Sequence, residues 1–258
     1  MRRHLYIIIN DGGMTNWLPN VIKDKSNYFR FFRSSEGGAW EENEISVYEN
    51  NFNFNNFREQ IRFQKNIGKP YDYIVIVFCG HGFSDVNGER WIEVRPGDTD
   101  DTYVAISQIR DVCYHTRTLF ISDSCAAIPL LEREENSGIG RLNMFSGDET
   151  YRTRCRRIYD KAVMNTSEYS FTAGYAVSLG EEAGENERGG IYSQTLLDVA
   201  RKTPTDLRRT SNEYASFSYV HSIAADIVAA RTDVYQHPAI EMSRSRYQFP
   251  FVVTPLIL

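Results

Sequence analysis

Short runs of apolar, β-branched and aromatic residues alternate along the whole chain with segments whose apolar residues recur at helical spacing. This alternation predicts an α/β fold, with a mostly parallel sheet covered by helices. Six strands are expected, at residues 5–10, 44–49, 73–79, 118–123, 169–173 and 239–242. The third and fourth lack polar residues at alternate positions, as strands buried on both faces do, so we expect them at the centre of the sheet.

Four helices and one hairpin fill the connections between these strands. The helices are predicted around residues 54–61 and 106–113, and over 192–200 and 219–231. The turn residues Asn87-Gly88 predict a small β-hairpin over residues 83–95, directly after the third strand. No repeat and no low-complexity linker divides the chain, so a single domain over residues 1–258 is expected.

Two stretches are predicted as mobile loops. Residues 132–161 begin with acidic residues and end in an arginine cluster, and residues 180–190 are rich in glutamate. Each stretch follows the carboxyl end of a strand, which is the edge of an open parallel sheet where ligands bind.

Composition narrows the classes of function. The 29 Lys+Arg and 34 Asp+Glu residues give a formal net charge of -5, which disfavours nucleic acid as a partner. No apolar run approaches the roughly 20 residues that cross a bilayer, and no secretory signal is recognisable. The four cysteines show no Cys-x-x-Cys pair, so a disulfide scaffold and a thiolate zinc site are excluded. We therefore expect a cytoplasmic protein without a membrane segment, a cofactor or a metal site, and leave a calcium requirement open.

Candidate chemistry lies at the ends of the two central strands. The third ends in Cys79-Gly80-His81-Gly82 and the fourth in Asp123-Ser124-Cys125. If the strands are adjacent and parallel, His81 and Cys125 meet at one edge of the sheet. An imidazole beside a thiol can take its proton and later protonate a leaving amine, and the Gly82 and Cys125 amides can face a developing oxyanion.

The same residues also have a purely structural interpretation. A cysteine at a strand end is more often a small buried apolar residue than a nucleophile, and a histidine between glycines is often only a turn residue. Spacing alone therefore leaves catalysis and packing open.

The two strand-end motifs together resemble the caspase-like cysteine peptidases, a clan that contains caspases, metacaspases, paracaspases and the bacterial orthocaspases. The resemblance rests on FCGHG and ISDSC, with weaker matches at FTAG, GGIYS and His237-Pro238. It implies a three-layer sandwich whose six-stranded, mostly parallel sheet has helices on both faces. It also implies that His81 is the general base, that Cys125 is the nucleophile, and that the Gly82 and Cys125 amides form the oxyanion hole.

The resemblance also bears on specificity. Caspases that cut after aspartate have Gln two residues before the nucleophile, whereas this chain has Asp123 there, as metacaspases and paracaspases do. It therefore implies a protein or peptide substrate cleaved after arginine or lysine. Glu181 and Glu182 are further candidates for this pocket, and a solvated acidic loop is the alternative for both.

Six arginines between the nucleophile and the fifth strand are candidates for self-cleavage by a protease of this specificity, and the cluster from Arg152 to Arg157 is the expected place. The six are Arg133, Arg141, Arg152, Arg154, Arg156 and Arg157. A solvated or substrate-docking surface is their alternative role, and an RNA-binding role is disfavoured by the net charge. For the whole chain, the alternative to a peptidase is a catalytically silent caspase-homology module that binds a partner. In either case we expect control by a regulatory partner or ligand.

Overall fold

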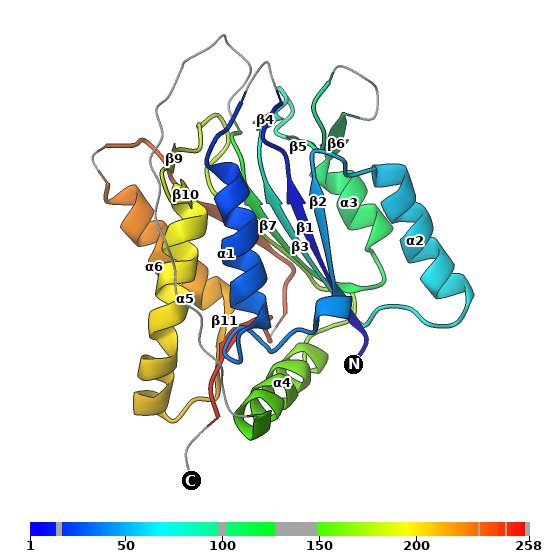
Figure 1. Cartoon of the computed structure of the whole chain (residues 1–258), viewed down its shortest axis with the longest axis vertical. Helices are drawn as coiled ribbons and strands as arrows, with labels where there is room; N and C mark the ends of the chain where they lie inside the picture. The colour runs from blue at the N-terminus through cyan, green and yellow to red at the C-terminus, as the bar shows by residue number, and fades with distance from the viewer. Residues whose placement is uncertain (14–16, 98–101, 127–148, 232, 246, 256–258) are drawn as a thin grey trace.

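The computed structural model describes residues 1–13, 17–97, 102–126, 149–231, 233–245 and 247–255. Its main sheet has six strands in the order β12-β8-β7-β3-β1-β2 (Figure 1). They are β1 (Arg3–Ile9), β2 (Ile45–Glu49), β3 (Tyr73–Cys79), β7 (Arg117–Asp123), β8 (Phe171–Tyr175) and β12 (Ala239–Met242). All neighbouring strands run parallel except β12, which is antiparallel to β8. The predicted six-stranded, mostly parallel sheet is confirmed, with β3 and β7 at its centre.

Helices cover both faces of this sheet (Figure 1). They are α1 (Val21–Arg33), α2 (Phe54–Asn66), α3 (Ile106–Val112), α4 (Glu149–Met164), α5 (Ile191–Thr210) and α6 (Phe217–Ala229), with a short 3-10 turn η1 (Glu42–Glu44). One core cluster packs α1, α4, α5 and α6 against one face, and a second packs α2 and α3 against the other. Burying apolar side chains on both faces explains why β1 and β3 have no exposed residue.

Three small sheets complete the described part of the fold. The predicted hairpin is present as β4 (Gly82–Ser84) and β5 (Arg90–Glu93), and β6 (Tyr103–Ala105) extends it to three strands. The other two sheets are β9 (Glu185–Asn186) with β10 (Gly189–Gly190), and β11 (Tyr214–Ser216) with β13 (Pro250–Val253). In the described ranges, no helix is both long and apolar enough to cross a membrane.

Two helical predictions need correction. Helix α5 continues ten residues beyond the predicted end at residue 200, through Pro204, because Thr203, Pro204 and Leu207 are buried there. The predicted loop at residues 132–161 is helical from Glu149 onward, because α4 buries Cys155, Tyr159 and Val163 in the main core. This packing stabilises a segment whose polar composition favoured a loop.

Candidate active site

Strands β3 and β7 bring the two sequence motifs to one edge of the sheet. They pair in parallel, and the last pair in register is Cys79 with Asp123. His81 and Cys125 each lie two residues beyond this pair. The Gly80 N–H donates a hydrogen bond to the Asp123 carbonyl at 3.1 Å, so the chains remain side by side as they leave the sheet.

The segment after His81 packs directly on the segment that carries Cys125. A methyl group on Gly82 would lie 2.8 Å from the Ser124 hydroxyl and 2.9 Å from the Cys125 carbonyl oxygen, so only glycine permits this approach. Farther along, the Ser84 hydroxyl donates to the Ala126 carbonyl. The predicted base, nucleophile and oxyanion-hole residues therefore lie on two contacting segments.

The Cys125 thiol is half-buried and lies against the backbone of Ala183. The Ala183 N–H donates to the Cys125 Sγ at 3.3 Å, and the Ala183 carbonyl lies 3.9 Å from the same sulfur. Burial raises the pKa of this thiol, the Ala183 N–H opposes the rise, and the negative charges of Glu182 and Asp123 add to it. The thiol therefore keeps its proton near neutral pH, and a separate base must remove it.

Glu93 is an additional acidic residue beside His81. The Glu93 N–H donates to the His81 carbonyl at 3.0 Å, and β5 pairs with β4 so that Glu93 is the next residue after the Gly82–Ile92 pair. Burial raises the pKa of the Glu93 carboxyl, and the charge of His81 acts in the opposite direction. The Glu93 carboxyl and the His81 side chain therefore lie within electrostatic reach of each other. Counting cross-strand pairs outward from the Asn87-Gly88 turn places Glu93 beside His81, so Glu93 could have been identified from the sequence.

Asp123 lies beside a second buried carboxyl, Asp24 of α1. Asp24 is completely buried and Asp123 is 6% exposed. Burial raises the pKa of Asp123 to about 6, although Ser193 hydrogen bonds oppose the rise. Burial, and then the charge of Asp123, raise the pKa of Asp24 well above its usual range. Two buried carboxyls whose charges act on each other do not both ionise readily.

The amino end of α5 holds these two carboxyls. The Gly190 N–H donates to the Asp24 Oδ2 at 2.9 Å, and the Ser193 N–H donates to the Asp123 Oδ2 at 2.8 Å. Side chains are excluded at this turn, since a methyl on Gly189 would lie 2.2 Å from an Asp24 oxygen and one on Gly190 2.2 Å from an Asp123 oxygen. The glycine pair thus lets both carboxyls reach the helix terminus, where its dipole favours negative charge.

The two glutamates predicted for the specificity pocket lie in different surroundings. One Glu181 oxygen is hydrogen-bonded to the His237 Nδ1 at 2.8 Å, and the other accepts from the backbone N–H groups of His237 and Ser178. Both of its oxygens are therefore engaged in holding residues 178–181 to His237. Glu182 is exposed, and its charge acts on the Cys125 thiol.

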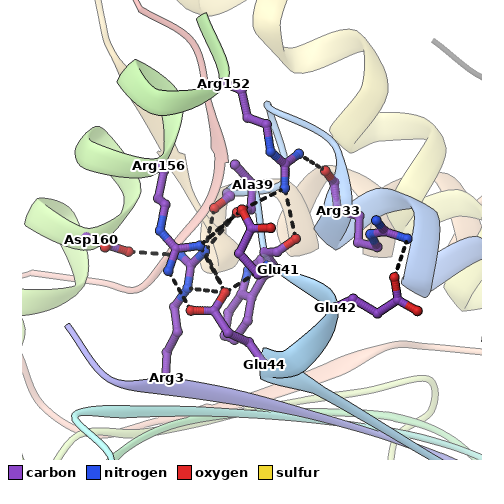
Figure 2. Close-up of polar contacts among 11 residues, drawn as sticks. Arg3, Arg33, Ala39, Glu41, Glu42, Glu44, Arg152, Arg156 and Asp160 are labelled. Carbon is purple, nitrogen blue, oxygen red and sulfur yellow. Dashed lines mark hydrogen bonds and ion pairs between the residues drawn. The ribbon is translucent and has the colours of Figure 1, made fainter. Parts of the chain in front are cut away.

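The arginine cluster expected in a loop lies on α4 (Figure 1). Helix α4 contacts Arg3 at the amino end of β1, whereas Cys125 follows the carboxyl end of the parallel strand β7, so the two lie at opposite ends of the sheet. Arg156 pairs with Glu44, which also contacts the buried Arg3, and Arg152 contacts Glu41 (Figure 2). Arg3 in turn forms an ion pair with Asp160 at 2.8 Å. Arg154 and Arg157 occupy exposed positions of the same helix. The remaining candidates, Arg133 and Arg141, lie outside the described residues.

Comparison with known proteins agrees with this geometry. The family model described as Caspase domain matches residues 2–249. A crystal structure of caspase-1 from Spodoptera frugiperda superposes with a TM-score of 0.55 at 13% sequence identity, covering 93% of this chain and 86% of that one, and so shares the fold. A search of curated proteins finds no match. Because the family model spans nearly the whole chain, this protein belongs to the caspase-domain family of cysteine peptidases.

Proposed function

We propose that this chain is a cysteine endopeptidase that uses Cys125 and His81 to cleave proteins after arginine or lysine. The observation that carries the specificity is the buried carboxyl pair of Asp24 and Asp123, next to the proposed nucleophile. The Asp24 Oδ1 is buried and has no hydrogen-bond partner among the residues described. A guanidinium or ammonium group would supply both the missing donor and the missing positive charge.

The proposed reaction has two stages. His81 removes the Cys125 proton, and the sulfur attacks the carbonyl carbon of the scissile bond while the Gly82 and Cys125 amides bind the developing oxyanion. The protonated His81 then gives its proton to the leaving amine, which leaves a thioester. Water, deprotonated by His81, hydrolyses the thioester and regenerates the thiol.

A panel of fluorogenic peptides that differ only in the residue before the cleaved bond tests this function. We expect hydrolysis after arginine and lysine, and little after aspartate or leucine. Hydrolysis after aspartate and none after arginine would overturn the assigned specificity. No hydrolysis of any peptide, together with unaltered partner binding by Cys125→Ala, would favour the silent module instead.

Asp123→Ala should lower kcat/KM for arginyl peptides by about 30-fold or more, because removing one member of a desolvated charge pair costs about 2 to 5 kcal/mol. Asp123 also caps α5 through the Ser193 N–H, so part of any loss could come from the helix rather than the pocket.

Asp123→Asn separates these two roles, since an amide oxygen still accepts from Ser193 but carries no charge. Its kcat/KM should fall for arginyl peptides and remain close to wild type for citrullyl peptides of the same sequence. Equal losses on both substrates would remove Asp123 from the specificity pocket.

Self-cleavage is expected after Arg133 or Arg141 rather than on α4. A peptidase substrate binds in an extended form, and cleavage at Arg152 or Arg156 would require α4 to unwind and their contacts with Glu41 and Glu44 to break. Arg154 and Arg157 lie on the same helix and share this protection. Mass spectrometry of purified protein after prolonged incubation should detect one nick before α4, with both fragments still associated.

The Cys125→Ala protein is the control for this experiment, because it shares every cleavage site. Identical nicking in that variant would assign the cleavage to a contaminating protease. An intact wild-type chain under conditions that support peptide hydrolysis would exclude self-cleavage.

A further inference from the structure

The carboxyl pair is held asymmetrically. The Ser193 N–H donates a hydrogen bond to the Asp123 Oδ2 at 2.8 Å, and the Ser193 hydroxyl acts on Asp123 to lower its pKa. The Tyr28 hydroxyl lies behind, donating to the Ser193 Oγ at 3.1 Å. Asp24 receives the Gly190 N–H on its Oδ2, and the Asn27 side chain acts to lower its pKa, while its Oδ1 has no hydrogen-bond partner in the described part of the chain. Because Asp24 is completely buried and its Oδ1 has no donor, a negative charge is less stable on Asp24 than on Asp123.

Among the described residues, the groups that act most strongly on the pair from neighbouring elements carry no positive charge. Besides Asn27 of α1, they are acids or phenols: Cys79 of β3, Glu185 of β9, Tyr28 of α1 and Tyr192 of α5. Glu182 and the Cys125 thiol lie on the open side. A second negative charge here would be buried among groups that repel it, so one proton must stay with the pair.

We propose that Asp24 and Asp123 share one proton while the pocket is empty, and that a basic substrate side chain expels this proton as it binds. This inference rests on the proposed function. The O–H bond of the Asp24 carboxyl breaks, its proton passes to the solvent, and the two carboxylates face one guanidinium or ammonium group. Recognition of arginine is then linked to proton release.

This linkage fixes the sign of the pH dependence. Below the pKa of the pair, binding of a basic side chain must displace a proton, so affinity for arginyl peptides falls as the pH falls. One proton released per peptide corresponds to a tenfold loss of affinity per pH unit. A peptide with citrulline in place of arginine carries no charge, so its affinity should not follow this slope.

Isothermal titration calorimetry measures the proton release directly. It is done on the Cys125→Ala protein, which should bind the peptide without hydrolysing it. An arginyl peptide amide is titrated at about pH 7 in two buffers of different ionisation enthalpy, and the difference in heat gives the protons released. We expect about one proton per peptide for Cys125→Ala. In the Cys125→Ala, Asp24→Asn double variant the peptide should bind with release close to zero, because Asp123 alone already carries the charge.

Ser193→Ala, again with Cys125→Ala, is a second variant that does not alter either carboxyl. It keeps the N–H donor and loses the hydroxyl, so the anion on Asp123 is less stable. When Ser193→Ala is combined with Asp24→Asn, so that Asp123 titrates alone, the midpoint of its proton release should therefore move up by about one pH unit. A residue that only packs α5 would leave this midpoint unchanged.

The possible failures are distinguishable. Tight binding of the arginyl peptide with no proton release at any pH from about 5 to about 9, or undiminished release after Asp24→Asn, would overturn the shared proton and leave the proposed function intact. No binding of the arginyl peptide, together with no hydrolysis of arginyl peptides by the wild type, would overturn both.

Discussion

Cys125→Ala should lower peptide hydrolysis by at least about 10⁴-fold, because it removes the sulfur atom that forms the covalent intermediate in the proposed reaction. The fold should survive, since the residue is half-buried at a strand end and the change removes a single sulfur atom. The measurement is kcat/KM on the best arginyl peptide, with the unfolding temperature of each protein beside it.

Cys79→Ala is the matched control, because Cys79 lies on the neighbouring strand but is completely enclosed, 3.9 Å from the Ser193 hydroxyl. Burial and nearby carboxylates raise the pKa of its thiol well above the usual range, so it is a poor nucleophile. Cys79→Ala should therefore retain most of the activity. Retained activity in Cys125→Ala with a loss in Cys79→Ala would reverse the assignment.

His81→Ala should cost about 10²- to 10⁴-fold in kcat/KM, the usual contribution of a positioned acid or base. The surroundings of Cys125 strengthen this expectation, because burial and two nearby carboxylates keep its thiol protonated. The deficit should shrink as the pH rises toward the pKa of the thiol, since the thiolate then forms without a base. Parallel pH profiles of variant and wild type would contradict this role.

His115→Ala is the corresponding control, because His115 is exposed and precedes β7, at the amino end of the strand that carries the nucleophile. Its activity should match the wild type. If His81→Ala also stays within a factor of about three, His81 has no part in the reaction.

The sheet could be predicted because its strands are buried on both faces and therefore appear as uninterrupted apolar runs. All six predicted strands are present, and β3 and β12 have the predicted bounds. Helices α1 and α4 were not predicted, since each places only a narrow buried stripe among many polar residues. The β11–β13 pair joins segments more than thirty residues apart, and no local pattern encodes such a pairing.

Part of the candidate site could likewise be predicted from the sequence, and part could not. His81, Gly82, Asp123 and Cys125 could be found because parallel strands end at one edge, so two consecutive strand ends imply one site. Asp24 could not, because its helix was not recognised. Its signal is a carboxylate on the buried face defined by Val21, Tyr28 and Phe31, which becomes meaningful only once the helix is known.

The ionic cluster around Arg3 bears on how this chain could be divided. Arg3 and Glu44 precede residue 126, whereas Asp160 and Arg156 follow residue 149, so the contacts of the cluster join the two sides of that interval. The β7–β8 pairing does the same within the main sheet. Two separately expressed polypeptides, residues 1–126 and 149–258, would each lack strands and core residues that only the other supplies. The two polypeptides have complementary buried surfaces and oppositely charged side chains that pair with each other. Fragment complementation should therefore rebuild the fold without a covalent link between them.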